Sequence, residues 1–231
     1  MALHLALREP WAGAVLLFIA VAFGVPQFRA RQRLRQLLSS GDLRAILDVW
    51  NDAIDTLPHY RTVGPLIRAT AFAAHGLTDR ARGVLDRAER GLAWENALEH
   101  RLFVETLLDA FEGRRSQALD KARALRALPL PASPWAKSRA SVLRSAAGAL
   151  ARAFAHCPER GDAARLSAAA KHHPLVYWAM RYALAVVHID QGRRAEALAL
   201  VSAAPEWPEG SAFNAFQAEI IERGSPAPEH S

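Results

Sequence analysis

The chain has 231 residues, of which 51% are hydrophobic, and it carries a formal net charge of +6 at pH 7. This apolar content is enough for a continuous core and excludes a chain that is disordered throughout. A single cysteine, Cys157, excludes an internal disulfide and a zinc site built from cysteines. β-branched residues are sparse beside Ala, Leu, Arg and Glu, which are strong helix formers, so we predict an all-α protein. The basic charge suits an anionic partner or surface, although coding bias alone could also produce it.

The first strong feature in chain order is an uncharged apolar run, residues 11–25. A straight helix of this length covers about 22 Å, short of the roughly 30 Å hydrocarbon core, so a span needs flanking residues or a thinner bilayer. Positive charge follows the run at once, and we expect it to lie at the membrane surface on the cytoplasmic side: Arg29, Arg31, Arg33 and Arg35. We therefore predict a single hydrophobic or transmembrane anchor helix, residues 1–27, in the inner (cytoplasmic) membrane, with the rest of the chain in the cytoplasm.

Two other interpretations of this run stay open. Ala20-Val21-Ala22 fits the cleavage site of a signal peptide, which would make the protein exported or periplasmic, although the arginines that follow oppose export. The run could instead form a helix that is buried in the fold or lies in the membrane interface.

From residue 28 onward the apolar spacing predicts one helix after another. In the first group, residues 28–128, we expect helices at 28–39, 43–57, 63–75, 78–90, 95–112 and 115–128. A proline-rich connection, residues 129–134, separates this group from a second one, residues 135–223. In the second group we expect helices at 135–156, 162–172, 175–191, 194–203 and 210–223. The last of these should cap the array, and residues 224–231 should form a disordered tail.

A short pattern recurs at the turns between these helices: a glycine is followed five residues later by an alanine. The three pairs are Gly76 and Ala81, Gly113 and Ala118, and Gly192 and Ala197. Glycine suits the end of a helix because it tolerates positive φ, and alanine suits a close crossing of two helices. Turn glycines at 41, 76, 113, 161 and 192 lie 31 to 48 residues apart, an interval typical of stacked helical hairpins.

These residues resemble the tetratricopeptide repeat family, whose unit has a large residue late in its first helix, a turn glycine, and small, large and small residues on its second helix. The second unit of the chain matches at Phe72, Gly76, Ala81, Leu85 and Ala88. The third matches at Gly113, Ala118, Ala122 and Leu125, and the last at Gly192, Ala197, Val201 and Ala204. Asp109 and His188 depart from the family, because an aromatic residue is expected at both positions. The resemblance covers about residues 28–205 and implies a right-handed superhelix of about five stacked antiparallel hairpins, a TPR-like solenoid, with a C-terminal capping helix.

The same resemblance implies a concave face, lined by the first helices of the hairpins, that binds a segment of a partner protein. By position, the partner-binding groove would contain Leu66, Thr70, Ala73, Phe103, Leu107, Tyr182 and Val186. The groove is mostly apolar and lacks the polar set with which chaperone-binding members clamp a terminal carboxylate, so we expect an apolar or helical ligand. The alternative is that the chain's own helices fill the groove.

Three groups of residues invite a catalytic or metal-binding interpretation: His172-His173, His188 with Asp190, and His156-Cys157-Pro158. Side chains one or two residues apart on a helix point in different directions, so neither pair is expected to converge on a shared site. A cysteine at a helix end is more often a small packed residue than a reactive thiol. We therefore predict a non-enzymatic protein without a metal or cofactor.

A membrane tether joined to helical repeats resembles the membrane-tethered scaffolds of bacterial envelope assembly, so we expect a scaffold or adaptor with a protein partner. The alternative is an RNA-binding helical-repeat protein whose arginines track phosphates. Those arginines are Arg80, Arg82, Arg87, Arg114, Arg115, Arg123 and Arg126. Acidic residues such as Asp79 and Asp120 are interspersed with them, as on an ordinary solvated face, so we do not expect nucleic acid to be the partner.

Overall fold

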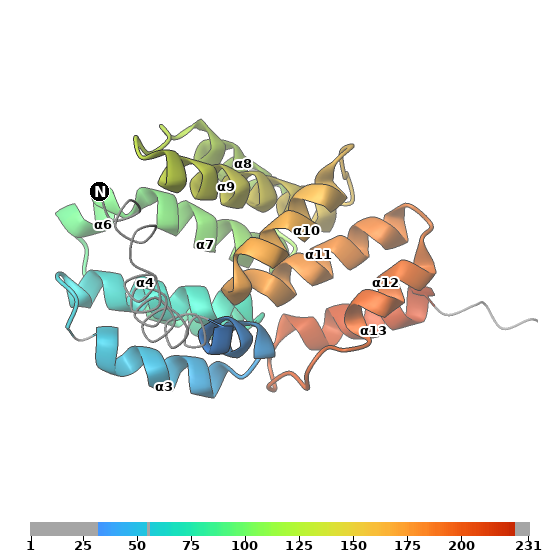
Figure 1. Cartoon of the computed structure of the whole chain (residues 1–231), viewed down its shortest axis with the longest axis horizontal. Helices are drawn as coiled ribbons and strands as arrows, with labels where there is room; N and C mark the ends of the chain where they lie inside the picture. The colour runs from blue at the N-terminus through green and yellow to red at the C-terminus, as the bar shows by residue number, and fades with distance from the viewer. Residues whose placement is uncertain (1–31, 55, 225–231) are drawn as a thin grey trace, which may run out of the picture.

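The computed structural model describes residues 32–54 and 56–224 (Figure 1). Over these ranges the protein contains helices and no strand, and helix packs against helix, as predicted. The predicted anchor, the possible cleavage site, Arg29 and Arg31 lie outside the described residues, as does the tail after Gly224. No helix within the described ranges is both long and apolar enough to cross a bilayer.

The helices follow the predicted order closely. Residues 32–40 form the first described helix. The others are α3 (Leu43–Ile54), α4 (Tyr60–Ala74), α5 (Thr78–Asp86), α6 (Leu92–Asn96), α7 (Leu98–Phe111), α8 (Arg115–Ala127), α9 (Pro134–Phe154), α10 (Asp162–His172), the 3₁₀ helix η1 (Pro174–Val176), α11 (Tyr177–Asp190), α12 (Arg194–Val201) and α13 (Ala212–Gly224). The helix predicted at 95–112 is divided in two, because Ala97 ends α6 and precedes α7.

The turns between helices confirm the glycine pattern. All five predicted turn glycines, at 41, 76, 113, 161 and 192, have φ between 72° and 90°, a left-handed conformation that favours glycine. The alanines that follow them at the close crossings, Ala81, Ala118 and Ala197, have no exposed surface. Local backbone requirements therefore fix both the ends and the contact faces of these helices.

Consecutive helices pair into hairpins, α4 with α5, α7 with α8, α9 with α10, and α11 with α12. The first helices of these hairpins form an inner row: α7 packs between α4 and α9, and α11 packs on α9 (Figure 1). α11 also contacts α4, the first member of the row. The row therefore closes on itself. As a result, the described helices cover part of its inner face.

α13 completes this closure by connecting the last hairpin to the first. Ser211 Oγ donates a hydrogen bond to the carbonyl oxygen of His75 at 2.7 Å, and Ala212 N donates to that of Gly76 at 2.9 Å. The buried ring of Phe213 stacks on Tyr182, with 4.6 Å between ring centres, and meets Phe111 edge to face at 5.4 Å. α13 was expected to cap the end of the array, but it also fills the inner face with aromatic side chains.

A buried carboxylate holds three helices together at a position where the tetratricopeptide repeat resemblance implies an aromatic residue. Asp109, near the end of α7, is only 1% exposed, and its oxygens lie 2.6 Å from Arg82 Nη2, 2.8 Å from Arg114 Nη2 and 2.7 Å from Lys121 Nζ. Asp109 can be buried because α5 and α8 both pack on α7 and supply the compensating cations.

The proline-rich connection, residues 129–134, does not interrupt the core. Arg144 of α9, only 4% exposed, donates to the carbonyl oxygens of Leu128 and Pro129 and to Glu99 Oε1 on α7. One cluster of buried apolar residues runs from α4 to α13 across this connection. The two predicted groups of hairpins are therefore packed on each other.

Candidate functional site

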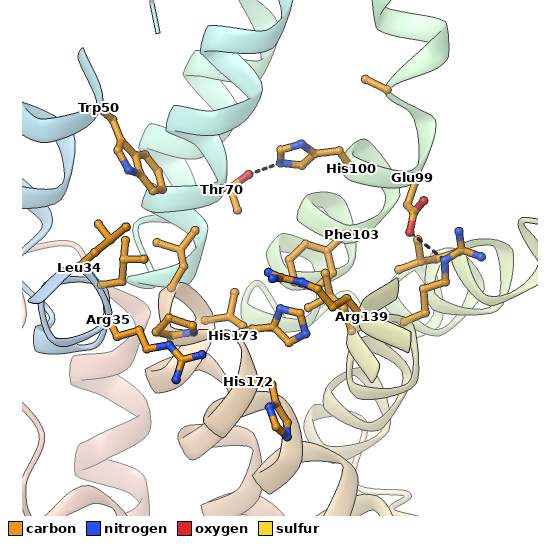
Figure 2. Close-up of a pocket in the computed structure, with 18 of the residues that line it drawn as sticks. Leu34, Arg35, Trp50, Thr70, Glu99, His100, Phe103, Arg139, His172 and His173 are labelled. Atoms are coloured by element: carbon orange, nitrogen blue, oxygen red, sulfur yellow. Dashed lines mark hydrogen bonds and ion pairs between the residues drawn. The ribbon is translucent and has the colours of Figure 1, made fainter. Parts of the chain in front are cut away.

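Among the described residues, a cavity of about 1040 Å³ lies at the N-terminal ends of α7 and α9 and beside η1, which precedes α11 (Figure 2). The first turns of α7, the N-terminal half of α9, and η1 form much of its wall. The helix at 32–40 forms another side and is tied to α11, because Trp178 Nε1 donates to the carbonyl oxygen of Ser39 at 2.9 Å. The aromatic cluster around Phe213 lies at the C-terminal ends of α7 and α9, where it includes Phe111 and Phe154. One end of the inner row is therefore filled, and the other end is hollow.

Apolar side chains cover most of the cavity surface: Leu34, Leu38, Trp50, Phe103, Leu143 and Leu175. A side pocket of about 320 Å³ adjoins it between α3 and α4 and adds Ile54, Leu57 and Ile67. Trp50 and Leu175 line both spaces. Together they offer an apolar surface of the kind that binds an apolar ligand.

Two polar residues in the wall satisfy each other. The Thr70 hydroxyl donates to the carbonyl oxygen of Leu66 at 2.7 Å, so its oxygen accepts from His100 Nε2 at 2.5 Å. Burial lowers the pKa of His100, so the imidazole is neutral at pH 7. This pair therefore adds hydrogen bonding to the wall without adding charge.

The remaining charge in the cavity is positive. Glu99 is the only acidic residue among the described lining residues, and it is paired with Arg144 at 2.9 Å. Arg35 and Arg139 line the cavity and have no acidic partner among the residues that the structure describes. Figure 2 shows the two arginine side chains reaching inward from opposite walls, with His173 between them. These groups can bind an anion by charge-assisted hydrogen bonds.

His173 adds an unsatisfied polar atom to this arrangement. Its Nε2 atom is buried and has no hydrogen-bond partner. Burial first, and then the nearby Arg139 and His172, lower its pKa below the ordinary value. A buried polar atom without a partner costs free energy, so a ligand that supplies the partner gains affinity here.

The structure divides the predicted groove between the cavity and the core. Thr70 and Phe103 line the cavity. The predicted groove residues that are buried in the core, where a partner cannot reach them, are Leu66, Ala73, Leu107 and Tyr182. Val186 lines a small pocket of about 190 Å³ beside Phe154 and Phe216. The predicted groove residues therefore do not form one open surface, because the chain's own side chains cover most of them.

Tyr182 illustrates why these residues are unavailable. Its hydroxyl accepts from Trp207 Nε1 at 2.7 Å and donates to Gln217 Oε1 at 3.0 Å. Burial raises the pKa of Tyr182 to about 12. The side chain is a satisfied core residue that connects α11 to α13.

The histidine groups lie differently from the expectation. His172 and His173 both line the cavity, because α10 ends at His172 and His173 has a non-helical conformation with φ −126° and ψ 81°. His156 Nδ1 lies 3.0 Å from Asp190 Oδ1 on a neighbouring hairpin, which joins members of two groups that we considered separately. Cys157 is exposed and not packed. Within the described ranges, no three His, Cys, Asp or Glu side chains are grouped to hold a metal ion.

Arg35 and Arg139 were not identified as cavity residues from the sequence. The sequence predicts both Arg33 and Arg35 at the membrane surface, and both are exposed, but only Arg35 lines the cavity. Side chains two residues apart on a helix point in directions that differ by about 200°. This periodicity could have shown from the sequence that Arg33 and Arg35 face different surroundings. The side chain of Arg139 lies over the ring of Trp135, four residues earlier, but no sequence signal shows that it faces a cavity.

Comparisons with protein-family models, with curated proteins and with solved structures found no match to this chain.

Proposed function

We propose that this chain is a non-enzymatic, membrane-anchored adaptor of the TPR-like, right-handed superhelical type, and that it binds an apolar helical segment of a partner protein. The binding site is the cavity at the N-terminal ends of the inner helices, and not the whole inner face. The observation that carries the proposal is a cavity of about 1040 Å³ with mostly apolar walls, beside an inner face that the described side chains otherwise fill in part, as Phe213 and Tyr182 do.

The volume of the cavity supports a helical ligand. A helix about 10 Å across occupies about 120 Å³ per residue, at a rise of 1.5 Å per residue. A cavity of about 1040 Å³ therefore accommodates roughly nine residues, or two and a half turns. A segment of this length presents two or three apolar side chains on one face, as in other helix-in-groove complexes.

Three of the seven arginines that suggested RNA binding form ion pairs within the protein. Arg82 and Arg114 bind the buried Asp109, and Arg123 binds Asp120 at 2.6 Å. Guanidinium groups used in this way do not form a continuous path for phosphates. A protein partner is therefore the better proposal.

Site-specific photocrosslinking in native membranes tests the proposal. A benzophenone amino acid replaces Leu34, which lines the cavity and is 44% exposed, and in a matched control it replaces Val49 of α3, which is 53% exposed and lines none of the cavities described above. We expect a discrete protein adduct from position 34 only, and mass spectrometry should map it to an apolar helical segment. Equal adducts from both positions, or adducts with lipid alone, would contradict the proposal.

The anchor is tested separately by the mass of the mature protein and by its extraction from membranes. An intact N-terminus and retention after an alkaline wash are expected for an anchor formed by residues 11–25. Loss of about twenty N-terminal residues would instead indicate a cleaved signal peptide.

A further inference from the structure

We propose that the segment bound in the cavity is acidic and places a carboxylate side chain between Arg35 and Arg139. This inference rests on the proposed function, because it assigns the chemistry of the ligand in the same site. It follows from the charges of the cavity wall and not from its volume.

Because of the way in which Arg144 is bound, no described acidic residue of the cavity wall is left to neutralise Arg35 and Arg139. Arg144 takes the only acidic residue among the described lining residues, Glu99, and also two backbone carbonyl oxygens. Because Arg144 is almost completely buried, its pairing with Glu99 is part of the packing between α7 and α9. Glu99 therefore does not neutralise Arg35 or Arg139.

The geometry places these cations where a ligand meets them. Arg35 comes from the helix at 32–40 and Arg139 from α9, so they stand on opposite walls (Figure 2). The Arg139 guanidinium lies 4.7 Å from the centre of the Trp135 ring, a contact that restricts its position. A carboxylate between the two walls accepts hydrogen bonds from both guanidinium groups and from His173 Nε2 in the tautomer that is protonated there.

An acidic peptide is favoured over an anionic lipid by the apolar side pocket. Ile54, Leu57 and Ile67 surround a space of about 320 Å³ that branches from the main cavity beside Thr70 and His100. A branched space fits a helix that inserts one large side chain sideways while its axis lies in the main cavity. The bound segment is therefore expected to combine a bulky apolar residue with an acidic one.

Two matched synthetic peptides test the inference on the full chain in nanodiscs of zwitterionic lipid. Both are amphipathic 14-residue helices with the same Leu, Phe and Ala face, and they differ only in carrying Glu or Lys at the polar positions. The dissociation constants are measured by fluorescence anisotropy of the labelled peptides. We expect the Glu peptide to bind about tenfold more tightly, which corresponds to two partly screened ion pairs.

Charge variants show whether the preference comes from the cavity. Arg35→Gln and Arg139→Gln should each reduce the preference to about threefold, whereas Arg33→Gln changes the net charge equally from a position that does not line the cavity and should leave it at tenfold. Loss of the preference in Arg33→Gln as well would overturn the inference, because the overall charge would then explain it.

The remaining outcomes separate this inference from the proposed function. Equal affinity for the two peptides would overturn the acidic ligand and leave the helix-binding cavity in place. Failure of both peptides to bind would count against the proposed function itself. Binding of labelled phosphatidylglycerol that is lost in Arg139→Gln, without binding of either peptide, would replace the peptide ligand by a lipid.

Discussion

Replacing Gly76 with alanine tests whether α13 closes the inner row of helices. Gly76 has a φ of +72°, and a Cβ atom there would lie 2.7 Å from Ser211 Oγ and 3.0 Å from Phe213 Cδ1. Gly113 is a matched control, because it has a φ of +73° in an equivalent turn and a Cβ atom there would meet nothing within 4 Å. The two substitutions impose the same backbone strain and differ in their contact with the start of α13.

The expected destabilisation follows from these distances. A non-glycine residue in the left-handed conformation costs about 1–2 kcal/mol, which is the whole cost expected for Gly113→Ala. Gly76→Ala adds about 1–3 kcal/mol for overpacking against Ser211 and Phe213, giving about 2–5 kcal/mol in total. In a chain of this length, 1 kcal/mol lowers the melting temperature by about 2–4 °C.

Urea unfolding followed by circular dichroism measures both free energies of unfolding. The double substitution Gly76→Ala with Phe213→Ala should be less destabilising than the sum of the single substitutions, because the shorter side chain removes part of the clash. Equal destabilisation by Gly76→Ala and Gly113→Ala, together with strict additivity in the double variant, would refute the contact between the first turn and α13.

Three further predictions concern stability. Asp109→Ala should cost about 1–3 kcal/mol, because it removes a buried acceptor from Arg82, Arg114 and Lys121, which keep Glu112 or Glu105 as a second partner, whereas Asp120→Ala, at an exposed pair with Arg123, should cost less than about 1 kcal/mol. Arg144→Ala should also cost about 3–5 kcal/mol by separating α9 from α7 and from the 129–134 connection, with the exposed Arg126→Ala as its control; similar urea midpoints for the two variants would contradict this role. Burial lowers the pKa values of His75 and His100 below the ordinary 6.5. As the pH falls through 6.5, these histidines therefore bind protons in the unfolded chain but stay neutral in the folded chain. Unfolding free energy should therefore be constant above about pH 7.5 and decrease on acidification by up to about 1.4 kcal/mol per pH unit for each histidine, and His75→Gln should reduce that slope.

The features predicted correctly from the sequence are those that neighbouring residues determine. The positive φ of Gly76 or Gly113 is required by the end of one helix and the start of the next, within a few residues. Apolar spacing identified the buried faces for the same reason, since a helix presents every third or fourth residue to its neighbour. Helix order and turn positions are therefore encoded locally.

The features that the sequence did not reveal depend on distant segments. The environment of Asp109 is set by Arg82, 27 residues earlier, and by Lys121, 12 residues later. Closure of the inner row depends on how several hairpins pack on one another, and no single residue specifies it. The sequence places Leu107 and Phe103 on the same face of one helix. It does not show that distant helices bury Leu107 in the core while Phe103 lines the cavity.

The position of the helix at 32–40 links the cavity to the proposed anchor. Residues 26–31 are the only ones between the apolar run and Gln32, which lines the cavity. Seven residue steps separate Val25 from Gln32, and they span at most about 25 Å even when fully extended. If residues 11–25 hold the chain in a bilayer, as we propose, the cavity wall at Gln32 lies within about 25 Å of the end of the anchor. Arg33 can then contact lipid headgroups while Arg35 faces the ligand, and the partner segment must itself lie close to the membrane, as the juxtamembrane segment of a membrane protein does.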